Sequence, residues 1–224
     1  MAMLEQTLDY RLLNDFQRNF PLCPAPFAEL AARLGVAESA VLRILEQLRR
    51  DGKIARVGAV FAPNRIGAST LAAMAVAPEK LRRVAETISR FPEVNHNYQR
   101  EHRYNLWFVV IAGSEGRLQA ALGAIEQAAG YPMLKLPLVQ DIPDALIGEI
   151  AASLAHEPGV TLCYQRPRVL PEWPYNLFCM IHGQARDEVE AKIAELRTRL
   201  KLTGYAHDTL FSITRFKQTG ARYA

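Results

Sequence analysis

The sequence contains one β-hairpin pattern twice, and this repeat constrains the fold more than any other feature. The segment VNHNYQREHRYNLWFVVIAG at 94–113 returns in a longer form as VTLCYQRPRVLPEWPYNLFCMIHG at 160–183. The matching positions are Val94 with Val160, Tyr98 with Tyr164, Arg100 with Arg166, and Tyr104 with Tyr175. The turn of the second copy carries extra residues, which include three prolines and one of the two tryptophans of the chain. The repeat therefore predicts two related β-sheet domains.

The residues around each hairpin predict the order strand, helix, hairpin, helix, strand. In the first copy the flanking elements are expected at 69–77, 79–91, 117–130 and 131–138. In the second copy they are expected at 138–142, 144–156, 187–200 and 209–216. This βαββαβ order is ferredoxin-like. We therefore predict ferredoxin-like domains at 65–138 and 139–224, joined at LKLPLVQDI without a turn signal or linker.

The first sixty residues follow a different pattern, with apolar residues at helical spacing. Helices are predicted over 8–20, 27–35 and 36–52, and the alternating segment KIARVGAVFAP at 53–63 is predicted to form a wing. A short helix, a glycine-containing turn and a second helix form a helix-turn-helix arrangement. The chain is therefore predicted to be an α+β protein, with a winged helix-turn-helix domain at 1–64 before the two ferredoxin-like halves.

The predicted recognition helix is poorly suited to reading DNA. Such a helix presents polar side chains from its first turns to base edges. Here those turns contain Ala37, Glu38, Ser39 and Ala40, and Glu38 would repel phosphates. Specific DNA binding is therefore doubtful, and the alternative is a winged helix kept for dimerisation or as a scaffold.

Composition narrows the class of protein further. A net charge of +4 permits an anionic partner without requiring one. The three cysteines form no CxxC pair, which suits a reducing compartment, and Cys163 and Cys179 are expected to be buried thiols on strands. The start has no signal-peptide pattern, and no apolar run is long enough to span a bilayer. We expect a cytoplasmic protein with no membrane contact. Phosphate-loop, dinucleotide and zinc-protease motifs are absent from the sequence.

The wing RVGAVFAPNRIG followed by a ferredoxin-like module resembles the feast/famine (leucine-responsive, AsnC-type) regulator family. The hairpins point to a narrower group. VNHNYQREHRYNLWFVV is similar to one subunit type of the siroheme decarboxylases, and CYQRPRVLPEWPYNLFCMIHG with LFSITRFKQTGARY is similar to the other. The resemblance covers essentially the whole chain. A fusion of this kind should contain a second winged helix near 138, and this sequence contains none there.

The resemblance implies removal of CO₂ from the C12 and C18 acetate side chains of siroheme, giving 12,18-didecarboxysiroheme, in haem d1 or alternative haem synthesis. The macrocycle takes up the electron pair, so no separate cofactor is implied, and the only iron is that of the substrate. Siroheme, its product and a second copy of the chain in a homodimer are the implied partners. Two other readings stay open: a transcriptional regulator with a small-molecule sensor domain, and a non-catalytic tetrapyrrole carrier.

Strand alternation places the expected site residues on one face of each hairpin. His96, Tyr98 and Arg100 should point together in the first copy, as should Tyr164 and Arg166 in the second. The arginines suit carboxylate binding, and the tyrosines either donate to carboxylates or cap the sheet. His96 is the predicted proton donor, because the unperturbed pKa of histidine is near neutrality.

Two further histidines have alternative readings. His102, in the first hairpin turn, is either a catalytic group or an ordinary exposed histidine. His182, after the second hairpin, is either an iron ligand or second acid, or a satisfied histidine at a strand end. Either His96 or His182 could ligate the substrate iron, and no protein-only metal site is expected.

The remaining candidates lie in the insertion and at the C-terminal end. Trp173 and Tyr175 either form a wall for the macrocycle or rigidify the proline-rich turn. Lys217 and Arg222 are either carboxylate partners or solvated basic residues.

Overall fold

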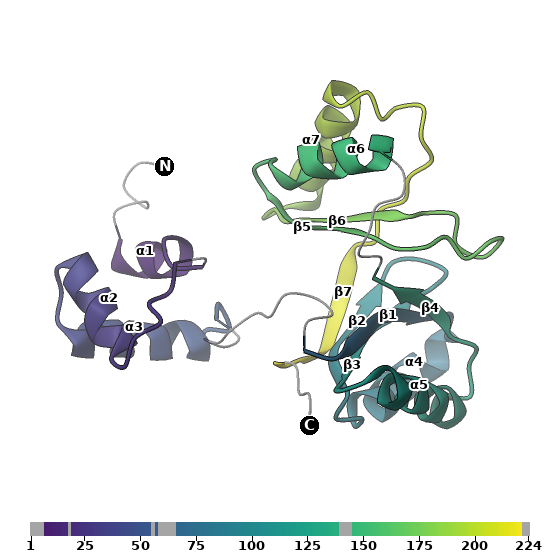
Figure 1. The fold of residues 1–224 in the computed structure, drawn as a ribbon, viewed down its shortest axis with the longest axis horizontal. Helices are drawn as coiled ribbons and strands as arrows, with labels where there is room; N and C mark the ends of the chain where they lie inside the picture. Colours follow the sequence, from purple (N-terminus) through teal and green to yellow (C-terminus); the bar gives the residue numbers. More distant parts are fainter. Residues whose placement is uncertain (1–6, 18, 55–56, 58–65, 139–144, 221–224) are drawn as a thin grey trace. The chain divides into compact units, whose positions relative to one another are not determined.

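The computed structural model describes residues 7–17, 19–54, 57, 66–138 and 145–220. The chain divides by its contacts into two compact units, residues 1–60 and residues 61–224. Figure 1 shows the first unit as a group of helices and the second as sheets with helices packed on them. Among the described helices, none combines the length and apolar character needed to cross a bilayer.

The described part of the first unit contains the helices α1 Leu8–Asn14, α2 Pro26–Leu34 and α3 Glu38–Arg50. They pack around a shared apolar core of Leu12, Leu30, Ala31, Leu34 and Val41. Gly35 ends α2 at a φ of 69°, a left-handed conformation that glycine adopts without strain. These helices confirm the predicted helix-turn-helix, although α1 is shorter than expected. The predicted wing lies almost entirely outside the described residues.

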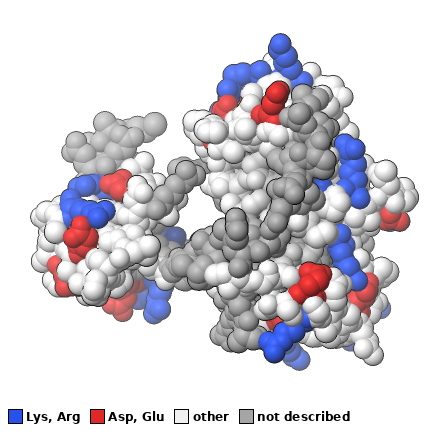
Figure 2. All heavy atoms as spheres, in the orientation of Figure 1, with Lys and Arg blue, Asp and Glu red and all other residues white. Residues whose placement is uncertain are grey.

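The structure shows which residues of α3 reach the surface. Val41 and Leu48 are buried, whereas Glu38 and Ser39 in the first turn are exposed. Figure 2 shows basic and acidic side chains interspersed over the described surface in view. The first turn of α3 thus presents an acidic side chain, which DNA phosphates would repel.

The first half of the second unit has the predicted element order. Its elements are β1 Ala68–Met74, α4 Pro78–Ser89, β2 Val94–Arg100, β3 Leu106–Ala112, α5 Glu115–Ala129 and β4 Leu134–Pro137. The strands pair in the order β4-β1-β3-β2, which is the ferredoxin-like arrangement. Helices α4 and α5 cover one face of this sheet (Figure 1). The core beneath them includes Ile88, Val94, Phe108, Leu122 and Ile125.

The second half contains α6 Ala145–Ala155, β5 Val160–Gln165, β6 Leu177–Ile181, α7 Arg186–Arg199 and β7 Ser212–Gln218. Strands β5 and β6 form a sheet that has two strands within the described residues. Strand β7 does not join it. Instead β7 pairs antiparallel with β2 and becomes an edge of the first half's sheet. The predicted strand at 138–142 lies outside the described residues, except for residue 138.

The position of β7 differs from a simple tandem of two independent halves. The outer edge of β2 has backbone N–H and C=O groups that need partners, and β7 satisfies them. Each half of the second unit therefore depends on the other. The face of the sheet opposite α4 and α5 packs against the β5-β6 hairpin, through Trp107 and Leu136 on one side and Trp173 and Phe178 on the other.

Candidate active site between the two sheets

The candidate site residues His96, Tyr98 and Arg100 of β2 share the sheet face opposite α4 and α5. A bulge between Val94 and His96 sets the register, after which His96 pairs with Val109 and Tyr98 with Trp107. Trp107 belongs to the cluster opposite the helices, so its cross-strand partner Tyr98 points to that side too. The rings of His96 and Tyr98 lie 6.1 Å apart, and Arg100 lies over the Tyr98 ring at 5.5 Å.

Arg215 of β7 joins this group, and the sequence-based prediction missed it. Its register partner is Tyr98, so both side chains lie on the same face of the sheet. Arg215 is exposed, and its Nη1 donates to Oε1 of Gln218 at 3.1 Å. Alternation predicts which residues of SITRFKQ share a face with Arg215, but it does not predict a neighbouring strand. Only the pairing of β7 with β2 brings Arg215 beside Tyr98.

The chemical state of Tyr98 follows from this setting. Burial raises the pKa of the Tyr98 phenol, and the nearby charges of Arg215 and Arg100 oppose that shift. The phenol therefore keeps its proton at neutral pH and acts as a hydrogen-bond donor. A protonated phenol between two guanidinium groups is a suitable environment for an anionic oxygen.

The two repeated arginines join the halves to each other. Nη1 of Arg100 in the first half donates to the carbonyl of Leu210 in the second at 3.0 Å. Nη1 of Arg166 in the second half donates to the carbonyl of Leu136 in the first. Burial lowers the pKa of both guanidinium groups, that of Arg166 to about 10, and both stay charged at neutral pH. Their repetition thus has a structural cause, whether or not they also contact a substrate.

Trp173 lies in an aromatic core between the halves. It is only 3% exposed and touches the rings of both hairpins. Its ring neighbours are His102, Tyr104, Trp107, Tyr175 and Phe178, with centroids 5.1 to 6.2 Å away. The ring therefore has no free face that a macrocycle could cover in this structure. Of the two sequence-based readings, the geometry matches the one in which Trp173 rigidifies the insertion, and Tyr175 is half-buried beside it.

His102 is held on both ring nitrogens. Its Nδ1 accepts from the backbone N–H of Tyr104 at 2.9 Å, and its Nε2 lies 3.3 Å from Oδ2 of Asp208. A backbone N–H can only donate, so Nδ1 carries no proton and the ring proton of the neutral form is on Nε2, facing Asp208. The ring also packs edge-on against Trp173. His102 therefore fixes the hairpin turn against the second half and is not an exposed turn histidine.

The face of the β5-β6 hairpin that carries Phe178 is mainly apolar, and it is partly exposed. Tyr164 pairs with Phe178 and Leu162 with Met180, and both Leu162 and Met180 are about two-fifths exposed, at 40% and 39%. Next to this face, His182 is exposed, and its Nε2 lies 3.0 Å from the Thr161 hydroxyl. The exposed apolar pair supplies surface suited to a flat ring.

Lys217, one of the two basic candidates near the C-terminal end, does not join this group. Nζ of Lys217 donates to the carbonyls of Ser89 and Phe91, at 2.8 and 2.9 Å, where α4 ends. Lys217 pairs with the buried Asn97 and so lies on the helix-covered side of the sheet. Cations at a helix C-terminus stabilise its unpaired carbonyls. Arg222 lies outside the described residues.

Known protein families match both units of the chain. The family of the AsnC-like ligand binding domain matches residues 65–140 and again residues 137–217. The siroheme decarboxylase NirDL-like HTH domain matches residues 9–54. The fold and these matches define the class of protein: a helix-turn-helix unit followed by a duplicated AsnC-like ligand-binding module.

Curated relatives narrow the class to one family. The siroheme decarboxylase NirDL subunit of Paracoccus denitrificans is 30% identical over 99% of this chain and 99% of its own. The NirD subunit of Pseudomonas aeruginosa is 50% identical over 58% of this chain and 87% of its own. The NirL subunit of Stutzerimonas stutzeri is 53% identical over 39% of this chain and 51% of its own. This chain belongs to the siroheme decarboxylase family.

A solved structure agrees with this fold. The crystal structure of the siroheme decarboxylase NirDL matches with a TM-score of 0.70 at 23% identity, covering 96% of this chain and 94% of that chain. The predicted α+β class is therefore confirmed, and the curated relatives confirm the predicted family.

The comparisons also bear on the join between the halves. The alignment with the Paracoccus denitrificans relative has 321 positions, whereas this chain has 224 residues, so that relative contains a long segment without a counterpart here. The two AsnC-like matches overlap at 137–140, which leaves no residues between them for a second helix-turn-helix domain. This agrees with the sequence-based expectation that such a domain is missing near 138.

Proposed function

We infer that this chain is a siroheme decarboxylase, which removes CO₂ from acetate side chains of siroheme in haem d1 synthesis. Its membership of the family over its whole length supports this function. A second crystal structure, of a siroheme decarboxylase NirDL in co-complex with an iron-uroporphyrin III analogue, supports an iron tetrapyrrole as the ligand class of the fold. The observation that carries the proposal for this chain is the convergence of His96, Tyr98 and Arg215 on the sheet face opposite α4 and α5.

Each residue has a distinct role in this proposal. Arg215, with Arg100 beside it, binds carboxylates of the substrate, because a guanidinium group matches the geometry of a carboxylate. Tyr98 donates a hydrogen bond from its protonated phenol. Tyr164, Leu162 and Met180 supply the apolar side against which the ring lies. His182 contacts the substrate from the edge of the hairpin.

The chemistry requires one proton for each acetate lost. Breaking the bond between the methylene and the carboxylate releases CO₂ and leaves the bonding pair in the conjugated ring. A proton from His96 then converts the methylene to a methyl group, and solvent reprotonates the imidazole. The substrate macrocycle is the electron acceptor, so we propose that no separate cofactor takes part. The guanidinium groups hold carboxylates that survive, because tight pairing of the reacting one would stabilise its ground state.

Anaerobic incubation of the purified chain with siroheme tests this function. We expect the product to weigh less than siroheme by the mass of two CO₂ molecules, as measured by mass spectrometry. Tight binding with an unchanged mass would instead indicate a tetrapyrrole carrier. A salt-dependent footprint on operator DNA without any turnover would indicate a regulator. A cytoplasmic location and a homodimer stay predictions from the sequence.

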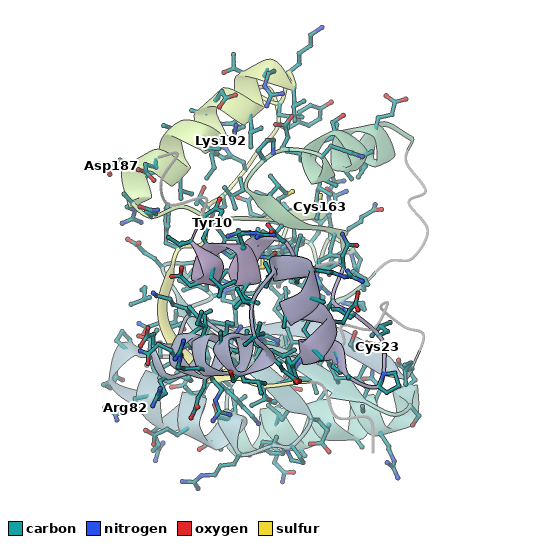
Figure 3. All side chains as sticks on the ribbon, turned by 90° about the vertical axis from the view of Figure 1, so that its left-hand side faces the viewer. Tyr10, Cys23, Arg82, Cys163, Asp187 and Lys192 are labelled. Atoms are coloured by element: carbon teal, nitrogen blue, oxygen red, sulfur yellow. The ribbon has the colours of Figure 1, made fainter. Side chains whose placement is uncertain are left out.

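Arg215 provides a test of the binding face. Replacing Arg215 with alanine should raise KM for siroheme about 10- to 100-fold, because a hydrogen bond to a charged group contributes about 1.5–3 kcal/mol. The value of kcat should change little, because the lost contact is made equally in the ground state and the transition state. Arg82→Ala is the matched control, because Arg82 lies exposed on α4 and pairs only with Glu86 among the ion pairs of the described residues (Figure 3). Equal KM values in both variants would remove Arg215 from the site.

A further inference from the structure

A pair of thiols on the β5-β6 hairpin has no role in the chemistry above. Cys163 on β5 and Cys179 on β6 are direct cross-strand partners, and their Sγ atoms lie 3.2 Å apart. Figure 3 shows Cys163 on its strand. Both side chains are half-buried, so a small oxidant can reach them, whereas the sequence predicted buried thiols. The remaining cysteine, Cys23, is exposed and belongs to the first unit.

The backbone register identifies the type of cross-strand pair. The N–H of Arg166 donates to the carbonyl of Asn176 at 2.9 Å, which makes these two residues a hydrogen-bonded pair. Hydrogen-bonded and non-hydrogen-bonded pairs alternate along an antiparallel ladder. Counting back along the register, Tyr164 with Phe178 is hydrogen-bonded, and Cys163 with Cys179 is not. Non-hydrogen-bonded partners have Cα atoms about 4.5 Å apart, which lies within the range that disulfides span.

We propose that Cys163 and Cys179 form a reversible intramolecular disulfide when the protein meets a hydroperoxide. The thiolate of one cysteine attacks the peroxide, breaks its O–O bond and becomes a sulfenic acid, with water or an alcohol as the leaving group. The second thiol then attacks that sulfur and releases water. With hydrogen peroxide, two thiols and one peroxide give one disulfide and two water molecules. The strands need only a small movement, because the sulfur atoms are already in contact.

The two cysteines have unequal roles in this reaction. A hydrogen bond from Cys179 lowers the pKa of the Cys163 thiol, because the bond stabilises the Cys163 thiolate. The same partnership, together with burial, raises the pKa of Cys179. This difference favours Cys163 as the attacking thiolate and Cys179 as the thiol that resolves the sulfenic acid, but either order gives the same disulfide.

The bond would constrain the part of the hairpin that holds the two halves together. The chain between the cysteines includes Arg166 and Trp173, which make the contacts with Leu136 and with the aromatic core. Tyr164 and Phe178 are the sequence neighbours of the two cysteines, and they project from the other face of the hairpin. Oxidation therefore fixes the strands that present the apolar side of the proposed site.

The test uses the full chain with Cys23→Ser as background, so that any lost thiol belongs to the pair. Dilute hydrogen peroxide should reduce the number of titratable thiols from two to none, with a mass loss of two hydrogen atoms. Dithiothreitol should restore both thiols. Trypsin cleaves after Arg168, between the two cysteines, so the oxidised protein should give one linked pair of peptides.

A second variant keeps the test decisive. Adding Cys163→Ser to the Cys23→Ser background should abolish the intramolecular disulfide under the same treatment, because Cys179 then has no partner thiol on the facing strand. The proposal is overturned if the Cys23→Ser protein gains oxygen atoms at Cys163 while Cys179 stays a thiol. Linkage between two chains, or two unreacted thiols, overturns it equally. The disulfide-linked tryptic peptides are measured on the Cys23→Ser protein alone, so this result does not depend on whether the double variant folds.

Discussion

Replacing His96 with alanine should abolish decarboxylation while leaving siroheme binding intact. Proton transfer by a positioned side chain typically accelerates a reaction about 10²- to 10⁴-fold, so kcat should fall by that factor. Binding should persist, because Arg100, Arg215 and the apolar face of β5-β6 remain in place. The measurement is a single-turnover assay for product mass, together with a titration of siroheme absorbance against protein concentration.

His156→Ala is the matched control for this experiment. His156 is an exposed histidine after α6 that hydrogen-bonds to the carbonyl of Ala152. Its replacement should leave both turnover and binding unchanged. Full activity in the His96 variant would show that His96 is not the proton donor. His182 would then be the next candidate for that role. Loss of binding as well as turnover would instead make His96 a substrate ligand.

Replacing Trp173 with alanine should produce the largest loss of stability in the second unit. Truncating a buried tryptophan costs about 3–5 kcal/mol, because the surrounding side chains cannot close the cavity. Here that cavity would open between the two halves, next to Trp107 and Phe178. The free energy of unfolding should be measured by urea denaturation, with Trp173→Phe retaining part of the stability.

Tyr205→Ala provides the comparison for the tryptophan variant. Tyr205 is 53% exposed in the same unit, so its removal should change the free energy of unfolding by less than about 0.5 kcal/mol. If Trp173→Ala unfolded at the same urea concentration as the parent protein, the ring would not belong to a packed core. The ring would then be available to a ligand, as expected if Trp173 forms a wall for the macrocycle.

Local patterns predicted most of the elements correctly. Helical spacing located the three helices of the first unit, and strand alternation located both hairpins, because each of these signals is complete within a short segment. The shared orientation of His96, Tyr98 and Arg100 also follows from alternation alone. The family was readable because the second hairpin motif is long and unusual.

The destination of β7 could not be predicted in the same way. Alternation identifies the strand SITRFKQ, but it carries no information about which edge the strand pairs with. The proximity of Arg215 to Tyr98 depends on that non-local pairing, so it was missed. The position of Lys217 behind the sheet depends on the same register.

The aromatic and basic residues of the hairpins were ambiguous for another reason. A tryptophan that lines a ligand pocket and a tryptophan that fills an interface between domains have the same sequence signal. Only the burial of Trp173 and its ring contacts distinguish the two. Likewise, the carbonyl partners of Arg100 and Arg166 explain why these arginines recur without reference to a substrate.

Strand β7 of the second half belongs to the sheet of the first half, and this has a consequence for how such a protein can be encoded. The halves are held together by the pairing of β7 with β2, by the packing of the aromatic core and by the two arginine hydrogen bonds. All of these contacts are non-covalent, and each is made by residues outside the segment that connects β4 to α6. Synthesis as one polypeptide or as two would therefore give the same set of contacts. The link would only keep the partners at a high local concentration, so a split version would assemble in a manner that depends on dilution.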